Sequence, residues 1–163
     1  MPYGLPMRRI PLLLLAFTVP AMAAEQGGDA SGLKLFDRLV GKCFSAVVGP
    51  SAADRHCFEA VYGGKHVRDR HRVAIDGKVV YAGETLYSRS GEKIVFTYIN
   101  TLGGVGHGKA NATATGIAFT GMMRSAPASP AQSMDSNWRW QGAGYLASDG
   151  KGADVVFKPV AAK

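Results

Sequence analysis

The chain has 163 residues, of which 47% are hydrophobic and 19% are charged, so it has enough apolar material for the core of one ordinary domain and lacks the composition of a disordered chain. Its 21 glycines follow no Gly-X-Y period, which excludes a collagenous fibre, and its 2 cysteines are too few for a disulfide-dense miniprotein. The net charge of +7 includes no basic run longer than residues 68–72, and this pattern does not favour a nucleic-acid partner.

The first 23 residues have the pattern of a secretory signal peptide. Arg8 and Arg9 precede a mostly apolar run at 10–19, and the small-residue pattern Ala-Met-Ala follows at 21–23. The run is too short to serve as a transmembrane helix, which needs roughly 20 residues. We therefore expect a mature domain of residues 24–163 that is exported, to the periplasm or as a secreted protein, without a transmembrane anchor after processing.

One short helix is predicted near the start of this domain. Ser31 can cap it, Leu33, Phe36 and Leu39 recur at helical spacing, and Gly41 ends it. After this point the sequence shows no further helical pattern.

The two cysteines are expected to form a disulfide, as is usual in exported chains. If a turn is centred on Pro50, Cys43 lies directly opposite Cys57 on the neighbouring strand. Directly opposed antiparallel residues lie about 4.5–5.5 Å apart at Cα, within the range that a disulfide requires. A redox or metal-binding pair is the alternative, although the CxxC spacing is lacking.

Short segments rich in β-branched and aromatic residues follow the helix, separated by turn signals at 63–64, 76–77, 90–91 and 115–116. The polar, Pro-rich segment 125–136 is interpreted as a mobile loop near a barrel mouth. The predicted fold is an all-β, antiparallel closed barrel of about 8–10 strands, because closure removes exposed strand edges. The expected strands are 42–48, 55–62, 65–74, 79–88, 93–99, 107–114, 117–123, 137–141, 144–147 and 154–159.

The expected hairpin registers separate an inner from an outer face. Two-residue turns at 63–64 and 76–77 pair Glu59 with Arg68 and Asp69 with Glu84. The inner face then collects Phe58, Ala60, Tyr62, Val67, Val73, Val80, Ala82 and Leu86, and the outer face collects Cys57, Glu59, His66, Arg68, Arg70, Arg72 and Thr85. A single-residue bulge at 63–64 would reverse the facing of residues 65–74.

Three ionisable residues, Asp69, His71 and Glu84, stand among the apolar residues of the expected inner face. Two buried carboxyl groups cannot both be charged cheaply, so they share a proton or hold a cationic His71 between them. We treat the three as candidate ligand-binding residues, with Tyr98 and Trp138 as further residues of the cavity wall. Two alternatives stay open: a satisfied polar network without a ligand, and an acid–base enzyme that uses His71 and Glu84.

Several short motifs resemble bacterial lipocalin-like proteins of the calycin superfamily. They are Leu-Phe-Asp-Arg-Leu-Val-Gly-Lys-Cys at 35–43, Gly-Gly-Lys-His-Val at 63–67, Arg-His-Arg-Val at 70–73, Tyr-Ala-Gly-Glu at 81–84 and Tyr-Ile-Asn at 98–100. The resemblance implies an exported barrel with a central cavity and a binding role. We expect its partner to be a small apolar or amphipathic molecule. One departure is Gly-Lys-Cys at 41–43, where such chains commonly carry Gly-x-Trp.

No cofactor or metal is predicted, and haem is the alternative that the histidines raise. The chain has His56, His66, His71 and His107, but none lies in the C-terminal strand region, where haem-binding relatives place the axial ligand. No HxxH or HxH pair is present to start a zinc site, and binding of calcium or zinc is left as a further alternative.

Overall fold

The structure is a computed structural model that describes residues 33–149, 152 and 154–162. The expected signal peptide at 1–23 and the expected helix cap Ser31 lie outside these residues. Among the described residues, no helix has the length and hydropathy that crossing a membrane requires.

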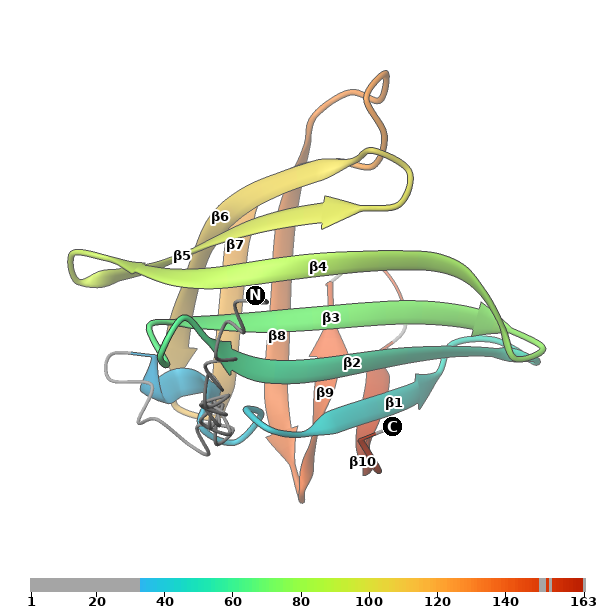
Figure 1. The fold of residues 1–163 in the computed structure, drawn as a ribbon, viewed down its shortest axis with the longest axis horizontal. Coiled ribbons are helices and arrows are strands. Elements are labelled where there is room, and N and C mark those ends of the chain that lie inside the picture. Colours follow the sequence, from blue (N-terminus) through green and yellow to red (C-terminus); the bar gives the residue numbers. More distant parts are fainter. Residues whose placement is uncertain (1–32, 150–151, 153, 163) are drawn as a thin grey trace, which may run out of the picture.

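The described residues form a closed, antiparallel, ten-stranded barrel, which confirms the predicted fold class. Each strand pairs with the next along the chain, and the barrel closes where β1 pairs with β10, for example Cys43 with Val160 (Figure 1). The strands are β1 Cys43–Val47, β2 Ala52–Val61, β3 His66–Ile75, β4 Lys78–Ser90, β5 Lys93–Asn100, β6 Val105–Thr113, β7 Gly116–Arg124, β8 Gln132–Gln141, β9 Gly144–Ser148 and β10 Val155–Val160.

A short N-terminal segment closes one end of the barrel, which we call the closed end. The predicted helix is a single 3-10 turn, η1 Lys34–Phe36, and it lies beside the turn between β2 and β3 (Figure 1). Leu33, Phe36 and Leu39 are buried, and the Phe36 ring lies 4.3 Å from the ring of Tyr87. Burial of these side chains gives the segment a structural role at this end. The opposite end, which carries the turns at 48–51, 76–77, 101–104 and 125–131, is called the mouth.

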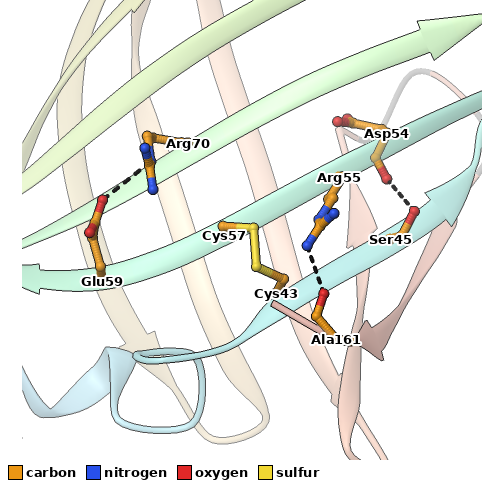
Figure 2. The surroundings of a disulfide bond; sticks show 8 residues. All are labelled: Cys43, Ser45, Asp54, Arg55, Cys57, Glu59, Arg70 and Ala161. Carbon is orange, nitrogen blue, oxygen red and sulfur yellow. Dashed lines mark hydrogen bonds and ion pairs between the residues drawn. A yellow bond between two sulfur atoms is a disulfide. The ribbon is translucent and has the colours of Figure 1, made fainter. Parts of the chain in front are cut away.

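The predicted disulfide is present and joins β1 to β2. Cys43 and Cys57 are direct partners in the ladder, with their Cα atoms 4.1 Å apart. Figure 2 shows the bond beside Arg55, whose guanidinium donates a 2.7 Å hydrogen bond to the carbonyl of Ala161. The disulfide links β1 to β2, and the hydrogen bond links β2 to the residue after β10. Together they stabilise the place where β1 pairs with β10.

The hairpin of β2 and β3 has the expected register, but the next hairpin does not. Glu59 pairs with Arg68 as predicted, although the turn spans 62–65 and leaves Tyr62 exposed instead of in the core. Between β3 and β4 a bulge interrupts the ladder, so that Ala74 pairs with Val79 while Val73 pairs with Tyr81. The extra residue, Val80, shifts the remainder of β4 by one position.

This shift reverses the facing predicted for β4, because side chains alternate with a period of two. Asp69 pairs with Thr85 instead of Glu84, so the predicted inward facing of Glu84 is wrong. The predicted core positions of Val80, Ala82 and Leu86 are wrong for the same reason. Thr85, expected outside, lies on the inner face with Tyr87.

Two strands, β2 and β8, begin at least three residues earlier than predicted. β2 starts at Ala52, which adds Asp54 to the strand, and its ladder with β3 runs unbroken from there. β8 starts at Gln132, so the predicted loop at 125–136 is wrong in its second half. Ladder pairing with β7 outweighs the polar composition of this segment, and it brings Met134 and Ser136 to the lumen.

Candidate functional site

The barrel lumen contains a cavity of about 180 Å³. Its wall is mostly aromatic and apolar, with a few polar groups. A dry apolar cavity of about 150 Å³ is large enough to hold benzene, so this one suits a molecule of about one ring. The lining residues are His56, Asp69, His71, Thr85, Tyr87, Phe96, Tyr98, Phe119, Met123, Met134, Ser136 and Trp138.

Asp69 on β3 is the buried acid of this wall. The residue is 2% exposed, and its Oδ2 accepts a 2.7 Å hydrogen bond from Nδ1 of His56. Its other oxygen, Oδ1, has no hydrogen-bond partner among the described residues. A buried polar atom without a partner is costly, and Asp69 is one of the residues that line the cavity.

His56 on β2 lies between two carboxyl groups. Besides Asp69, its Nε2 lies 3.4 Å from Oδ2 of Asp54, two residues earlier on the same strand. Burial acts against the charged imidazole, but the charge of Asp69 and the hydrogen bonds to Asp54 and Asp69 outweigh burial and raise the pKa of His56 to about 10. Burial likewise acts to raise the pKa of Asp54, yet the hydrogen bond from His56 and the approach of His71 hold it well below its usual range.

His71 on β3 lies directly opposite His56 in the ladder, and the two rings are 5.0 Å apart. Its Nε2 is hydrogen-bonded to Oη of Tyr98 at 3.1 Å, and Tyr98 is in turn hydrogen-bonded to Tyr81. Its Nδ1 lies 3.7 Å from Oδ1 of Asp54, and neither of these two buried atoms has a hydrogen-bond partner within the described part of the chain. Burial, followed by the interaction with Tyr81, raises the pKa of Tyr98.

Gly83 on β4 makes room for this arrangement. It pairs with His71, and a Cβ atom at this position would lie 2.7 Å from Oη of Tyr98 and closer still to Nε2 of His71. Any other residue at 83 would therefore displace the His71 ring.

Four of the predicted site residues, Asp69, His71, Tyr98 and Trp138, line the same cavity. Glu84 does not join them. It lies on the outer face, 4.0 Å from Arg68, with 37% of its side chain exposed. An acid–base pair of His71 and Glu84 is therefore contradicted, since the two side chains lie on opposite faces of the sheet.

Asp54 and His56 were missed as site residues. The sequence did carry a signal, because Asp54, His56 and Phe58 alternate along β2 and the correctly predicted β2–β3 register places His56 opposite His71. The signal was lost because the strand was expected to start at Arg55 and only Phe58 and later residues were assigned to the core.

A second hollow of about 270 Å³ lies against the other side of His56. It is lined by Asp54 together with residues of β8, β9 and β10, among them Ala147, Val155 and Phe157. His56, Ser136 and Trp138 line both this hollow and the lumen cavity.

No model of a known protein family matches the chain, and no curated protein matches it either. The closed ten-stranded antiparallel barrel is compatible with a lipocalin-like fold. The function therefore has to be inferred from the geometry of the lumen.

Proposed function

We propose that this protein is an exported, lipocalin-like binding barrel that holds a small, mainly apolar molecule in its lumen. The observation that carries the proposal is the aromatic cavity with one buried carboxylate, Asp69, whose Oδ1 has no hydrogen-bond partner among the described residues. Mostly apolar walls with a few placed polar groups are typical of small-molecule sites.

The cavity defines the chemistry of the ligand. Phe96, Phe119 and Trp138 suit a ring of about the size of benzene, by stacking and burial of apolar surface. Oδ1 of Asp69 can only accept hydrogen bonds as a carboxylate, so the ligand should carry an N–H or O–H group on one edge. A benzylamine-like or phenol-like molecule fits both requirements, whereas a carboxylate ligand would meet Asp69 with like charge.

The rim of the mouth supports an apolar ligand. Exposed apolar side chains gather on the turns and strand ends there, where a ligand would enter. They are Val47, Val48, Ile75, Val79, Val80, Ile99, Leu102 and Val105. Export to the periplasm or secretion is part of the proposal, and the Cys43–Cys57 disulfide supports it because such bonds persist in oxidising compartments.

Native mass spectrometry of the protein purified from its own cell envelope tests the proposal. We expect a retained small molecule, and calorimetric binding of benzylamine and phenol but not of benzoate to the emptied protein. Asp69→Asn should weaken benzylamine binding by about 10-fold or more, because it replaces an acceptor for a charge-assisted hydrogen bond. The matched control is Glu84→Gln, the same change on the outer face, which should leave the affinity unchanged.

The competing interpretation is a structural or interaction barrel without a ligand. It predicts no retained molecule and no binding of any single-ring compound. That result would overturn the binding proposal.

A further inference from the structure

We propose that Asp54, His56 and His71 form a binding site for a divalent transition-metal ion, with zinc as the expected occupant. One ligand-type atom from each residue lies within 4.8 Å of the others. Asp54 and His56 come from β2 and His71 comes from the neighbouring β3, so the rigid barrel wall holds all three. This inference does not depend on the proposed lumen ligand.

The spacing of the ligand atoms suits a tetrahedral ion. Oδ2 of Asp54 lies 3.4 Å from Nε2 of His56, and Oδ1 of Asp54 lies 3.7 Å from Nδ1 of His71. Nitrogen and oxygen ligands bind zinc at about 2.0–2.2 Å, so two ligands of a tetrahedral site lie roughly 3.3–3.6 Å apart. The two distances start from different oxygens of Asp54, and the three ligand atoms lie within 4.8 Å of one another, so an ion would draw them closer together.

In each histidine, the ring nitrogen that points away from Asp54 already has a hydrogen-bond partner. Nδ1 of His56 donates to Asp69 at 2.7 Å, and Nε2 of His71 is hydrogen-bonded to Tyr98 at 3.1 Å. Metal-binding histidines usually have a hydrogen bond on the nitrogen away from the metal, which fixes the ring orientation. These partners leave Nε2 of His56 and Nδ1 of His71 facing Asp54. A metal ion would take the place of the Nε2 proton of His56, which is released to solvent on binding.

A metal ion would also satisfy two atoms that the fold leaves without partners. Oδ1 of Asp54 and Nδ1 of His71 are buried and have no hydrogen-bond partner among the described residues. Such atoms cost about 1–3 kcal/mol each when unsatisfied. Coordination of one ion by both would remove this cost, because each offers a lone pair.

The donor set selects the class of metal. Two imidazole nitrogens and one carboxylate suit zinc and neighbouring transition metals, whereas calcium and magnesium prefer sites made of oxygen ligands. Three protein ligands leave a fourth position for water or another small molecule. The sequence search for HxxH or HxH could not find this site, because the two histidines face each other across strands.

Titration of the untagged, disulfide-bonded protein, stripped of metal with a chelator, tests the site. We expect one zinc ion per chain by calorimetry. Cobalt should give the strong visible absorption of a four-coordinate site, without a thiolate charge-transfer band since both cysteines are oxidised.

His71→Ala should lower the zinc affinity by roughly 100-fold, because it removes one of three ligands. The matched control, His107→Ala, removes an exposed histidine of β6 and should leave the affinity unchanged. Tyr98→Phe removes the hydroxyl that is hydrogen-bonded to His71 and Tyr81, keeps all three metal ligands, and should weaken zinc binding by about 10-fold. This milder variant keeps the test valid if His71→Ala does not fold.

Failure of the folded wild-type protein to bind zinc or cobalt would overturn the metal site, as would equal loss of affinity in His107→Ala and His71→Ala. Neither result bears on the lumen ligand, because benzylamine binding is measured on the metal-free protein.

Discussion

The closed end of the barrel differs in its contacts from the half of the lumen nearer the mouth, which we call the mouth half. Near the closed end, Phe36, Phe44 and Tyr145 are completely buried, and the Phe44 and Tyr145 rings lie 5.4 Å apart. Toward the mouth, the same barrel wall carries Asp54 and His71, two ionisable residues with buried atoms that lack partners. The first region gains stability from apolar burial, whereas the second retains polar groups that are costly to bury. The Tyr145 hydroxyl also lacks a partner among the described residues, so the two regions differ in their ionisable groups: Asp54 and His71 lie toward the mouth, and this is why the candidate site is assigned there.

The largest expected effect is a loss of stability at the closed end. Phe44→Ala should lower the free energy of unfolding by about 3–5 kcal/mol, because it empties a fully buried ring position. Urea denaturation measures this loss. A loss below about 1 kcal/mol would show that the closed end is not the stabilising region.

Loss of the His56 proton should make the metal-free protein less stable in alkaline solution. Its pKa is raised to about 10 in the folded state, so the folded protein binds more protons than the unfolded chain between the two pKa values. The contribution is complete below about pH 6.5 and is lost as the pH rises toward 10. Groups facing His56 are Asp54, Asp69 and His71.

Urea denaturation from pH 7 to 9 with a chelator present measures this slope. Asp69→Asn should flatten it, because the Asp69 charge is the largest cause that favours the charged form. Glu84→Gln serves as the control, and an unchanged slope in Asp69→Asn would contradict the assignment.

Gly83→Ala is expected to have an intermediate effect that is confined to the mouth half. The new methyl group would meet Tyr98 and His71, at a cost of about 1–3 kcal/mol, and should weaken zinc binding. Gly106→Ala is the matched control, since its nearest atoms lie at 3.4 Å. Urea denaturation and zinc titration measure the stability and the zinc affinity of both variants. Equal losses in the two variants would argue against a special role for Gly83.

The smallest effect is expected on the outer face. Glu84→Gln should change stability by less than about 1 kcal/mol, because Glu84 is partly exposed and lies 4.0 Å from Arg68. Thermal unfolding measures the change. A loss several times larger would mean that Glu84 faces the lumen after all.

The parts of the fold that depend on local turns could be predicted from the sequence. The turn at Pro50 gave the Cys43–Cys57 pairing, and Gly63 and Gly64 gave the register of β2 with β3. The bulge in β4 could not be predicted, because the extra residue is a valine between two β-forming residues and no glycine or proline marks it.

The candidate site was predicted only in part, because some of its residues lie on strands whose register is set by a local turn and others do not. Asp69 and His71 lie on β3, whose facing follows from the correct hairpin, whereas Glu84 lies beyond the bulge. The start of β8 was missed because Pro127, Pro130 and polar residues resemble a loop, although Met134 and Ser136 alternate toward the lumen. Whether such a segment forms a strand depends on its pairing with a neighbouring strand, and this pairing cannot be predicted from the segment alone.

Fluorescence of Trp138 reports most directly on the central claim that the mouth half of the lumen binds a ligand. In a Trp140→Phe background, Trp138 is the remaining tryptophan and lies in the cavity wall. Benzylamine should change its emission in a saturable way, with weaker affinity in Asp69→Asn and unchanged affinity in Glu84→Gln. No saturable change, or an equal affinity in all three proteins, would contradict the account.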